Sequence, residues 1–254
     1  MESAQQIKDL LEWYISAGVL ETCGDACLQI ATEQKQYAQY PLRQATTNLS
    51  QNKIASTQNA RELCTQANSL EELKALVSAF DGCSLKLTAK STVFGDGNPT
   101  AELMIVGEAP GADEDRMGLP FVGRSGRLLE KMLLSIGLKR EDVYITNVLP
   151  WRPPGNRTPT DAEVSICLPF LKRQIELIKP KLLLLLGGSA ANALLDNSDS
   201  ISRLRGRFLE YQTSLKTSIP ALASFHPAYL LRNSAQKAKA WTDFLRILKK
   251  LKEN

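Results

Sequence analysis

Several features that usually define a protein's class are scarce or missing in this sequence. Histidine occurs once, as His226, so any chemistry that needs an imidazole has one available donor. No apolar run reaches the roughly 20 residues of a membrane helix, and residues 1–9 carry no basic segment leading into an apolar one. We therefore expect a soluble intracellular protein with no membrane partner and no export signal.

Cysteine pairs and a strong net charge are missing too. Five cysteines scattered through 254 residues are an odd number, which is unlike a disulfide framework and fits a reducing cytoplasm. The 31 basic and 27 acidic side chains leave a net charge of +4, which neither requires nor excludes a nucleic-acid partner. With 43% hydrophobic residues, the chain can bury one sizeable core. We expect a cytoplasmic protein with one enzyme-sized domain.

The first 75 residues differ from the rest of the chain. Apolar residues at helical spacing begin at Ile7, and a stretch rich in Gln, Thr, Asn and Ala follows over about residues 29–57, where no periodicity is sustained. Ser69 and Glu72 then form a capping-box pattern ahead of a second helix. These patterns predict a helical extension with a polar linker over residues 1–75 and a compact domain over residues 76–254.

Short apolar runs alternate with helical patterns in the rest of the chain. Four runs are typical of buried strands: residues 103–106, 143–146, 182–186 and 221–225. Helical patterns lie near residues 126–136, 161–178, 189–195 and 236–251. This alternation predicts an α/β fold, with a central, mostly parallel four-stranded sheet flanked by helices on both faces.

Unusual residues follow each predicted strand. Residues 107–111, Asn147, the glycine pair 187–188 and His226 stand at the four carboxyl ends, where ligands bind in sheets of this kind. A single glycine or proline at such a position is more often simply part of a turn. The joint placement of these residues at four strand ends nevertheless favours one assembled site. Glycines also leave backbone N–H groups open to anionic oxygens, although the chain has neither a P-loop nor a full GxGxxG pattern.

Longer motifs then become recognisable. VGEAPGADED at residues 106–115, followed by GLPFVG at 118–123, closely resembles the first motif of family 4 uracil-DNA glycosylases. YITNV at 144–148, RPPGNR at 152–157 and SFHPAYLLR at 224–232 are similar to the remaining family segments in the same order. The resemblance covers roughly residues 80–248. It implies an enzyme that flips uracil out of DNA and hydrolyses its N-glycosidic bond, leaving an abasic site that initiates base excision repair.

The resemblance assigns four residues to the flipped base. Phe121 resembles the aromatic platform on which uracil stacks, although alone it would be read as a core phenylalanine. Asn147 can donate to a uracil carbonyl and accept from the ring N–H, which cytosine cannot match; an Asn turn is the competing explanation. Glu114 supplies bulk against the methyl group of thymine, unless it belongs to a solvated acidic turn. Ala109 lines the same pocket.

Three residues are assigned to the reaction itself. Cleavage develops positive charge on the sugar and negative charge on the departing base. His226 is similar to the family histidine that hydrogen-bonds the leaving uracil oxygen, whereas a lone histidine is more often structural. Glu108 is the carboxylate best placed to orient or deprotonate the attacking water, and Asn156 helps to position that water.

Further residues are assigned to the DNA on either side of the uracil. They are Arg124, Ser125, Gly188, Leu230, Leu231 and Arg232. The run ending in Arg232 resembles a loop that enters the minor groove with an apolar wedge, but an ordinary helix start would pack one of the two leucines inward. Arg124 and Ser125 stand at a predicted helix N-terminus, which suits a phosphate, although Arg124 could equally be a surface charge.

The sequence departs from the family pattern in its cysteines. Family 4 enzymes ordinarily hold a four-iron, four-sulfur cluster on four cysteines, but here Phe80 and Trp151 stand at the first and third positions, beside Cys83 and Cys167. Two thiolates cannot hold four irons in the usual way, so we expect no metal and no cofactor, with aromatic side chains filling the space.

We expect a monomer whose partner is uracil-containing DNA. Two other classes remain open: a protein that binds uracil in DNA without turnover, and a nucleotide-binding α/β module unrelated to repair.

Overall fold

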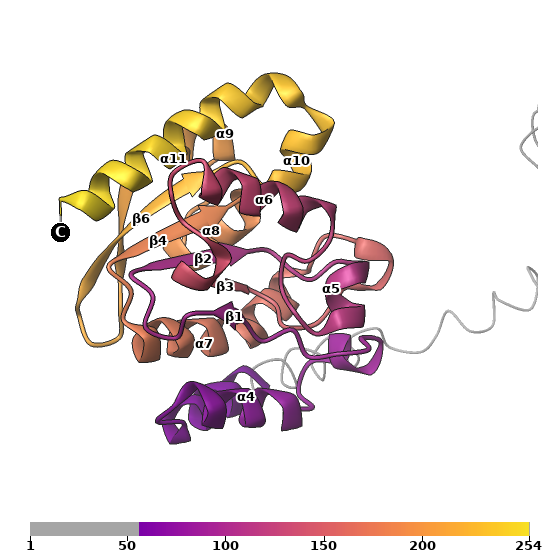
Figure 1. The fold of residues 1–254 in the computed structure, drawn as a ribbon. Coiled ribbons are helices and arrows are strands. Elements are labelled where there is room, and N and C mark those ends of the chain that lie inside the picture. Colours follow the sequence, from indigo (N-terminus) through magenta and orange to yellow (C-terminus); the bar gives the residue numbers. More distant parts are fainter. Residues whose placement is uncertain (1–55, 254) are drawn as a thin grey trace, which may run out of the picture. The chain divides into compact units, whose positions relative to one another are not determined.

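The computed structural model describes residues 56–253, in which helices cover both faces of a single sheet (Figure 1). The strands are β1 (Asp96–Gly97), β2 (Leu103–Gly107), β3 (Tyr144–Asn147), β4 (Leu182–Leu186), β5 (Phe208–Gln212) and β6 (Ser218–Ser224). Their order across the sheet is β1-β3-β2-β4-β6-β5. The four inner strands are parallel, and the edge strands β1 and β5 run antiparallel to their neighbours.

The α/β class and the four parallel strands are confirmed, but the prediction of a four-stranded sheet is wrong in number, because the sheet is mixed and has six strands. β1 has two residues, Asp96 and Gly97, and carries no apolar pattern. β5 lies at the other edge with most of its residues exposed or half-buried, so it lacks the continuous apolar run by which the inner strands were found.

Helices on the two faces bury alternate residues of the strands. The helices are α4 (Leu70–Ala79), α5 (Ala112–Met117), α6 (Arg124–Leu134), α7 (Asp161–Ile178), α8 (Gly188–Leu195), α9 (Ile201–Leu204), α10 (Pro227–Arg232) and α11 (Lys237–Lys252), with short 3-10 turns η2 (Ser84–Leu87), η3 (Arg140–Asp142), η4 (Pro154–Asn156) and η5 (Ser234–Gln236). In β4, Leu183 and Leu185 pack with α4, α7 and α8, whereas its other three leucines pack with α6 and α11. Burial on both faces explains why every residue of this strand is apolar.

Residues 56–75 pack against the sheet domain. Ser69 caps α4 as its pattern predicted, with its Oγ accepting a hydrogen bond from the N–H of Glu72 at 3.1 Å. Residues 56–66 are helical, and Cys64 and Ala67 are buried in the core that α7 shares. Arg173 of α7 donates two hydrogen bonds to the carbonyl of Ala67, at 2.6 and 3.1 Å.

The helix predicted at Ile7 lies outside the described residues, as does the predicted linker except for positions 56 and 57, which are helical. Within residues 56–253, no helix is both long and apolar enough to cross a membrane.

Candidate active site

A cavity of about 430 Å³ opens at the carboxyl ends of β2, β3 and β6. Nine of the thirteen predicted site residues line it: Glu108, Ala109, Glu114, Phe121, Ser125, Asn147, Asn156, His226 and Arg232. They come from positions more than 100 residues apart in the chain, and the parallel strands bring them to one edge of the sheet.

Phe121 and Asn147 meet over the end of β2. The ring of Phe121 is 4% exposed, and its centroid lies 5.5 Å from that of the His226 imidazole. Gly107 pairs with Asn147 across the sheet, and a Cβ at Gly107 would lie 2.4 Å from Asn147 Oδ1 and 2.6 Å from the Phe121 ring. Only glycine at position 107 therefore leaves room for both the Asn147 amide and the Phe121 ring beside the end of β2.

The carboxylate of Glu114 ties the two halves of the first motif together. Oε1 accepts hydrogen bonds from the N–H groups of Val122 and Gly123 at 3.0 and 2.9 Å, and Oε2 accepts from Gly111 at 3.1 Å. Glu114 and Asp115 are both buried, so the alternative of a solvated acidic turn is wrong. Asp115 instead accepts hydrogen bonds from the backbone of the segment before β1. The three bonds hold Glu114 rigidly at the cavity wall.

His226 is the N-cap of α10, and its hydrogen bonding fixes the tautomer of the neutral ring. Nδ1 accepts a hydrogen bond from the N–H of Ala228 at 3.1 Å, so the ring hydrogen is on Nε2. Burial lowers the pKa of His226 to about 4, with a further lowering by Arg232 and a partial offset by Glu114. At neutral pH the imidazole is therefore an uncharged donor through Nε2.

Asn156 lies on a loop that two arginines hold in place. Gly155 and Asn156 both have left-handed backbone conformations, with φ of 63° and 55°. Arg152 Nε donates to Asn156 Oδ1 at 2.7 Å, which leaves the amide nitrogen as the remaining donor. Arg157 pairs with Glu163, the residue whose carboxylate also accepts from the N–H of Thr160 at the start of α7. This loop is thus anchored to α7 as well as internally.

Four predicted DNA contacts lie outside the cavity. Leu230 is 1% exposed and packs with Phe225 and Ala240, so it lacks the exposure that a wedge requires, whereas Leu231 is 41% exposed. The helix start therefore packs one leucine inward. Arg124 is exposed at the first turn of α6, and Gly188 begins α8.

Among the other cavity-lining residues, two with polar side chains received no role from sequence reasoning. Arg157 and Tyr229 both stand inside the recognised motifs, so the motifs themselves could have singled them out.

Comparison with known proteins decides the family. The profile of the Uracil DNA glycosylase superfamily matches residues 94–252, which include every residue of the cavity. The chain belongs to this superfamily.

Three relatives show which branch of the superfamily is most similar. The chain is 43% identical over 183 residues to the type-4 uracil-DNA glycosylase of Archaeoglobus fulgidus, covering 70% of this chain and 92% of that protein. It is 41% identical to the type-4 enzyme of Thermotoga maritima, covering 66% and 88%. The type-5 uracil-DNA glycosylase of Pyrobaculum aerophilum is 31% identical over 55% of this chain and 67% of its own length. The type-4 enzymes are thus more similar over a longer stretch.

At the four positions that the sequence analysis assigned to a cluster, two side chains are aromatic and two are thiols, a set that does not fit a four-thiolate group. The rings of Phe80 and Trp151 are stacked with centroids 6.4 Å apart, and Phe170 packs edge-on against Phe80 at 5.1 Å. Cys83 and Cys167 are buried beside each other with their Sγ atoms 3.9 Å apart. Among residues 56–253, no three His, Cys, Asp or Glu side chains are grouped so as to hold a metal.

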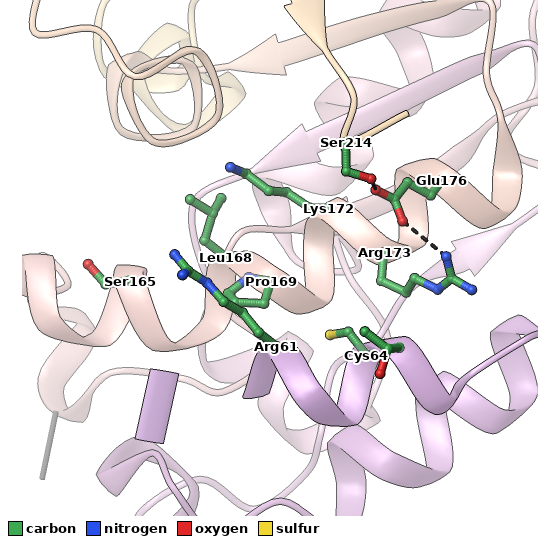
Figure 2. A pocket seen from close by; sticks show the side chains of 10 residues that line it. Arg61, Cys64, Ser165, Leu168, Pro169, Lys172, Arg173, Glu176 and Ser214 are labelled. Carbon is green, nitrogen blue, oxygen red and sulfur yellow. Dashed lines mark hydrogen bonds and ion pairs between the residues drawn. The ribbon is translucent and has the colours of Figure 1, made fainter. Parts of the chain in front are cut away.

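Cys64 lies elsewhere. It faces a separate pocket between helix 56–66 and α7, beside Arg173 (Figure 2). Burial raises the pKa of this thiol to about 12, so it stays protonated.

Proposed function

We propose that this chain is a monofunctional uracil-DNA glycosylase, which extrudes uracil from DNA and hydrolyses its N-glycosidic bond to initiate base excision repair. One observation carries the proposal: Phe121, Asn147 and the neutral His226 face a single cavity from three different segments. The similarity to two proteins named type-4 uracil-DNA glycosylases, over about nine-tenths of their length, supports it.

Base recognition rests on the ring of Phe121 and the amide of Asn147. The flipped uracil stacks on the Phe121 face, a contact worth about 1–3 kcal/mol. Asn147 donates from its NH2 group to a uracil carbonyl and accepts from the ring N–H through Oδ1. Cytosine presents an amine and an unprotonated nitrogen at those positions and is rejected. Glu114 is the rigid wall against the methyl group of thymine, and Ala109 completes the pocket.

His226 stabilises the leaving group. Negative charge develops on the departing uracil, and Nε2–H of the neutral imidazole donates a hydrogen bond to the oxygen that receives it. Loss of one such donor costs about 100- to 1,000-fold in the chemical step. Because its pKa lies well below neutrality, His226 acts as a hydrogen-bond donor and not as a proton donor.

The attacking water is handled by Glu108 and Asn156. Glu108 follows β2 directly and lines the cavity, so its carboxylate is available to orient the water and accept its proton. The amide nitrogen of Asn156 is the donor left free by the bond from Arg152, and it positions the same water.

DNA contacts surround the mouth of the cavity. The exposed Leu231 is the wedge that fills the gap left by the flipped base, and Arg232 contacts a phosphate. Arg124 and Ser125 at the start of α6, together with Gly188 at the start of α8, provide donors for flanking phosphates. We propose further that the enzyme is cytoplasmic and works as a monomer, with the stacking, base-reading and leaving-group residues supplied by one chain.

We further propose that this member works without an iron–sulfur cluster. Phe80 and Trp151 are buried where two of the four ligands would stand, which supports the proposal. Protein prepared without oxygen should be colourless, lack absorbance near ~400 nm and contain no stoichiometric iron. Brown protein with about four irons per chain would overturn this part of the proposal.

The activity is tested by measuring free uracil released from single- and double-stranded oligonucleotides that contain one uracil opposite guanine or adenine. We expect release from the wild type and a drop of about 100-fold or more in single-turnover rate for His226→Ala, with DNA binding retained. A protein that only binds uracil would shift the DNA and release nothing. A general nucleotide-binding module would bind free nucleotides and be indifferent to uracil in DNA.

A further inference from the structure

The backbone that presents the Phe121 ring has an uncommon conformation. Phe121 has a φ of 53°, in the left-handed region that a residue with a bulky side chain rarely adopts. Such a conformation persists only where surrounding contacts impose it. The contacts around this peptide therefore decide where the ring lies.

Arg140 binds the carbonyl groups on this side of the platform. Its Nη2 donates to the carbonyl of Pro120 at 2.5 Å, and its Nη1 donates to the carbonyl of Phe121 at 3.1 Å. The guanidinium is itself held by two carboxylates: Asp96 of β1 accepts from Nε at 2.6 Å, and Glu130 of α6 accepts from Nη1 at 3.2 Å. A planar guanidinium can bridge all four acceptors at once, which an ammonium cannot do.

The peptide is held from its other side as well. The Glu114 carboxylate accepts from the N–H groups of Val122 and Gly123, which follow the platform directly. Gly126 leaves room for the carbonyl of Phe121, because a Cβ there would lie 1.8 Å from that oxygen. Arg140 thus holds the carbonyls of residues 120 and 121, and Glu114 holds the amides of residues 122 and 123.

We propose that Arg140 is a positioning residue that fixes the Phe121 ring for stacking and thereby sets the affinity for a flipped base. Arg140 does not line the cavity, so its effect is transmitted through the backbone of the platform. Without it, the two carbonyls lose their charged donors, and the peptide is held only from the Glu114 side, so the ring is placed less firmly. The inference rests on the proposed function, because it assumes that a base stacks on this ring.

The test compares two DNA duplexes that differ only in the presence of a base. One carries a 2′-fluoro-deoxyuridine that resists cleavage, and the other carries a tetrahydrofuran abasic analogue in its place. Arg140→Gln should weaken binding to the uracil duplex about tenfold or more and change binding to the abasic duplex by less than about twofold, because the latter has nothing to stack. Arg140→Lys should retain part of the affinity by reaching one carbonyl.

Lys139→Gln is the matched control, since it removes an adjacent positive charge whose side chain pairs only with the exposed Glu141 among the described residues. It should bind both duplexes as the wild type does. In a Phe121→Ala background, Arg140→Gln should cost less than about twofold on the uracil duplex, because the group that it positions is gone. Asp96→Asn, which loosens the guanidinium without removing it, should give a smaller loss with the same preference for the uracil duplex.

Equal losses on the two duplexes, or an undiminished loss in the Phe121→Ala background, would overturn the inference and leave Arg140 a general stabiliser of the fold. If Arg140→Gln does not fold, the same comparison with Arg140→Lys and Asp96→Asn decides. Wild-type release of uracil is measured separately. A wild type that binds the uracil duplex but releases no uracil would overturn the proposed hydrolysis and leave the positioning role intact.

Discussion

Acidification offers a direct test of the neutral His226. Burial and Arg232 hold its pKa at about 4, whereas an ordinary histidine titrates near 6.5. At pH 5, about 9% of a group with a pKa of 4 is protonated, compared with about 97% of one with a pKa of 6.5. We therefore expect the imidazole to remain an uncharged Nε2–H donor throughout the range from pH 8 to pH 5.

The measurement is unambiguous because His226 is the only histidine in the chain. Untagged protein labelled with 15N-histidine should show a single imidazole spin system, with the proton on Nε2 and no titration above pH 5. When uracil release is followed over the same pH range, His226→Gln is the control, since its side chain keeps an N–H donor that does not titrate. A midpoint near 6.5, or a proton on Nδ1 at pH 7, would refute the argument from burial and from the bond to Ala228.

The same shift predicts how stability depends on pH. The pKa of His226 is lower in the folded chain than in the unfolded chain, so its contribution is complete above about pH 6.5 and is lost as the pH falls toward 4. At 1.36 kcal/mol per pH unit, the difference amounts to about 3 kcal/mol of unfolding free energy. Denaturant titrations at pH 7 and pH 4 should show the loss, and His226→Gln should reduce it.

Three further perturbations test the site and its support. Asn147→Asp should lower uracil release by about 100-fold or more and allow measurable cytosine release, since a carboxylate accepts from the cytosine amine; unchanged selectivity would remove Asn147 from base reading. Gly107→Ala should reduce uracil binding about tenfold by displacing Phe121, and wild-type affinity would contradict the close packing of Phe121 and Asn147 around Gly107. Deleting residues 1–49 should leave a folded enzyme. Deleting residues 1–69 also removes buried core residues and should lower the free energy of unfolding by at least about 2 kcal/mol. Thermal melts of the two truncated proteins would compare their stabilities.

Sequence patterns predicted the inner sheet because its signal is local. Each parallel strand is buried on both faces, so it appears as an apolar run that ends in a glycine, an asparagine or a histidine turn. The strand at residues 182–186 was predicted with the bounds that the structure has. The edge strands escaped prediction for two reasons: β1 is two residues long and pairs with the distant β3, and β5 exposes much of its length, although it pairs with the adjacent β6.

The residues of the site also divide into those that a local motif predicts and those whose contacts depend on the folded chain. Motifs placed Phe121, Asn147 and His226 in one pocket, but a motif does not state what a side chain contacts. The three backbone bonds of Glu114 depend on how residues 111 to 123 fold back on themselves. Arg140 stands outside every motif, 19 positions from Phe121, and only the folded chain brings it to that carbonyl.

The packed aromatic side chains of Phe80, Trp151 and Phe170 also support the loop that carries Asn156. Trp151 is fully buried and donates from Nε1 to Thr92 Oγ1 at 3.1 Å, directly before Arg152, which holds Asn156. Burial of the Phe80 and Trp151 side chains contributes about 1.5–3 kcal/mol each, as for other core aromatics. A four-cysteine cluster would link the segments before β2 and after β3 through bonds to metal, and here apolar burial links those segments. The loop that carries Asn156 is thereby fixed at its start by packing and at its end by the pair of Arg157 with Glu163.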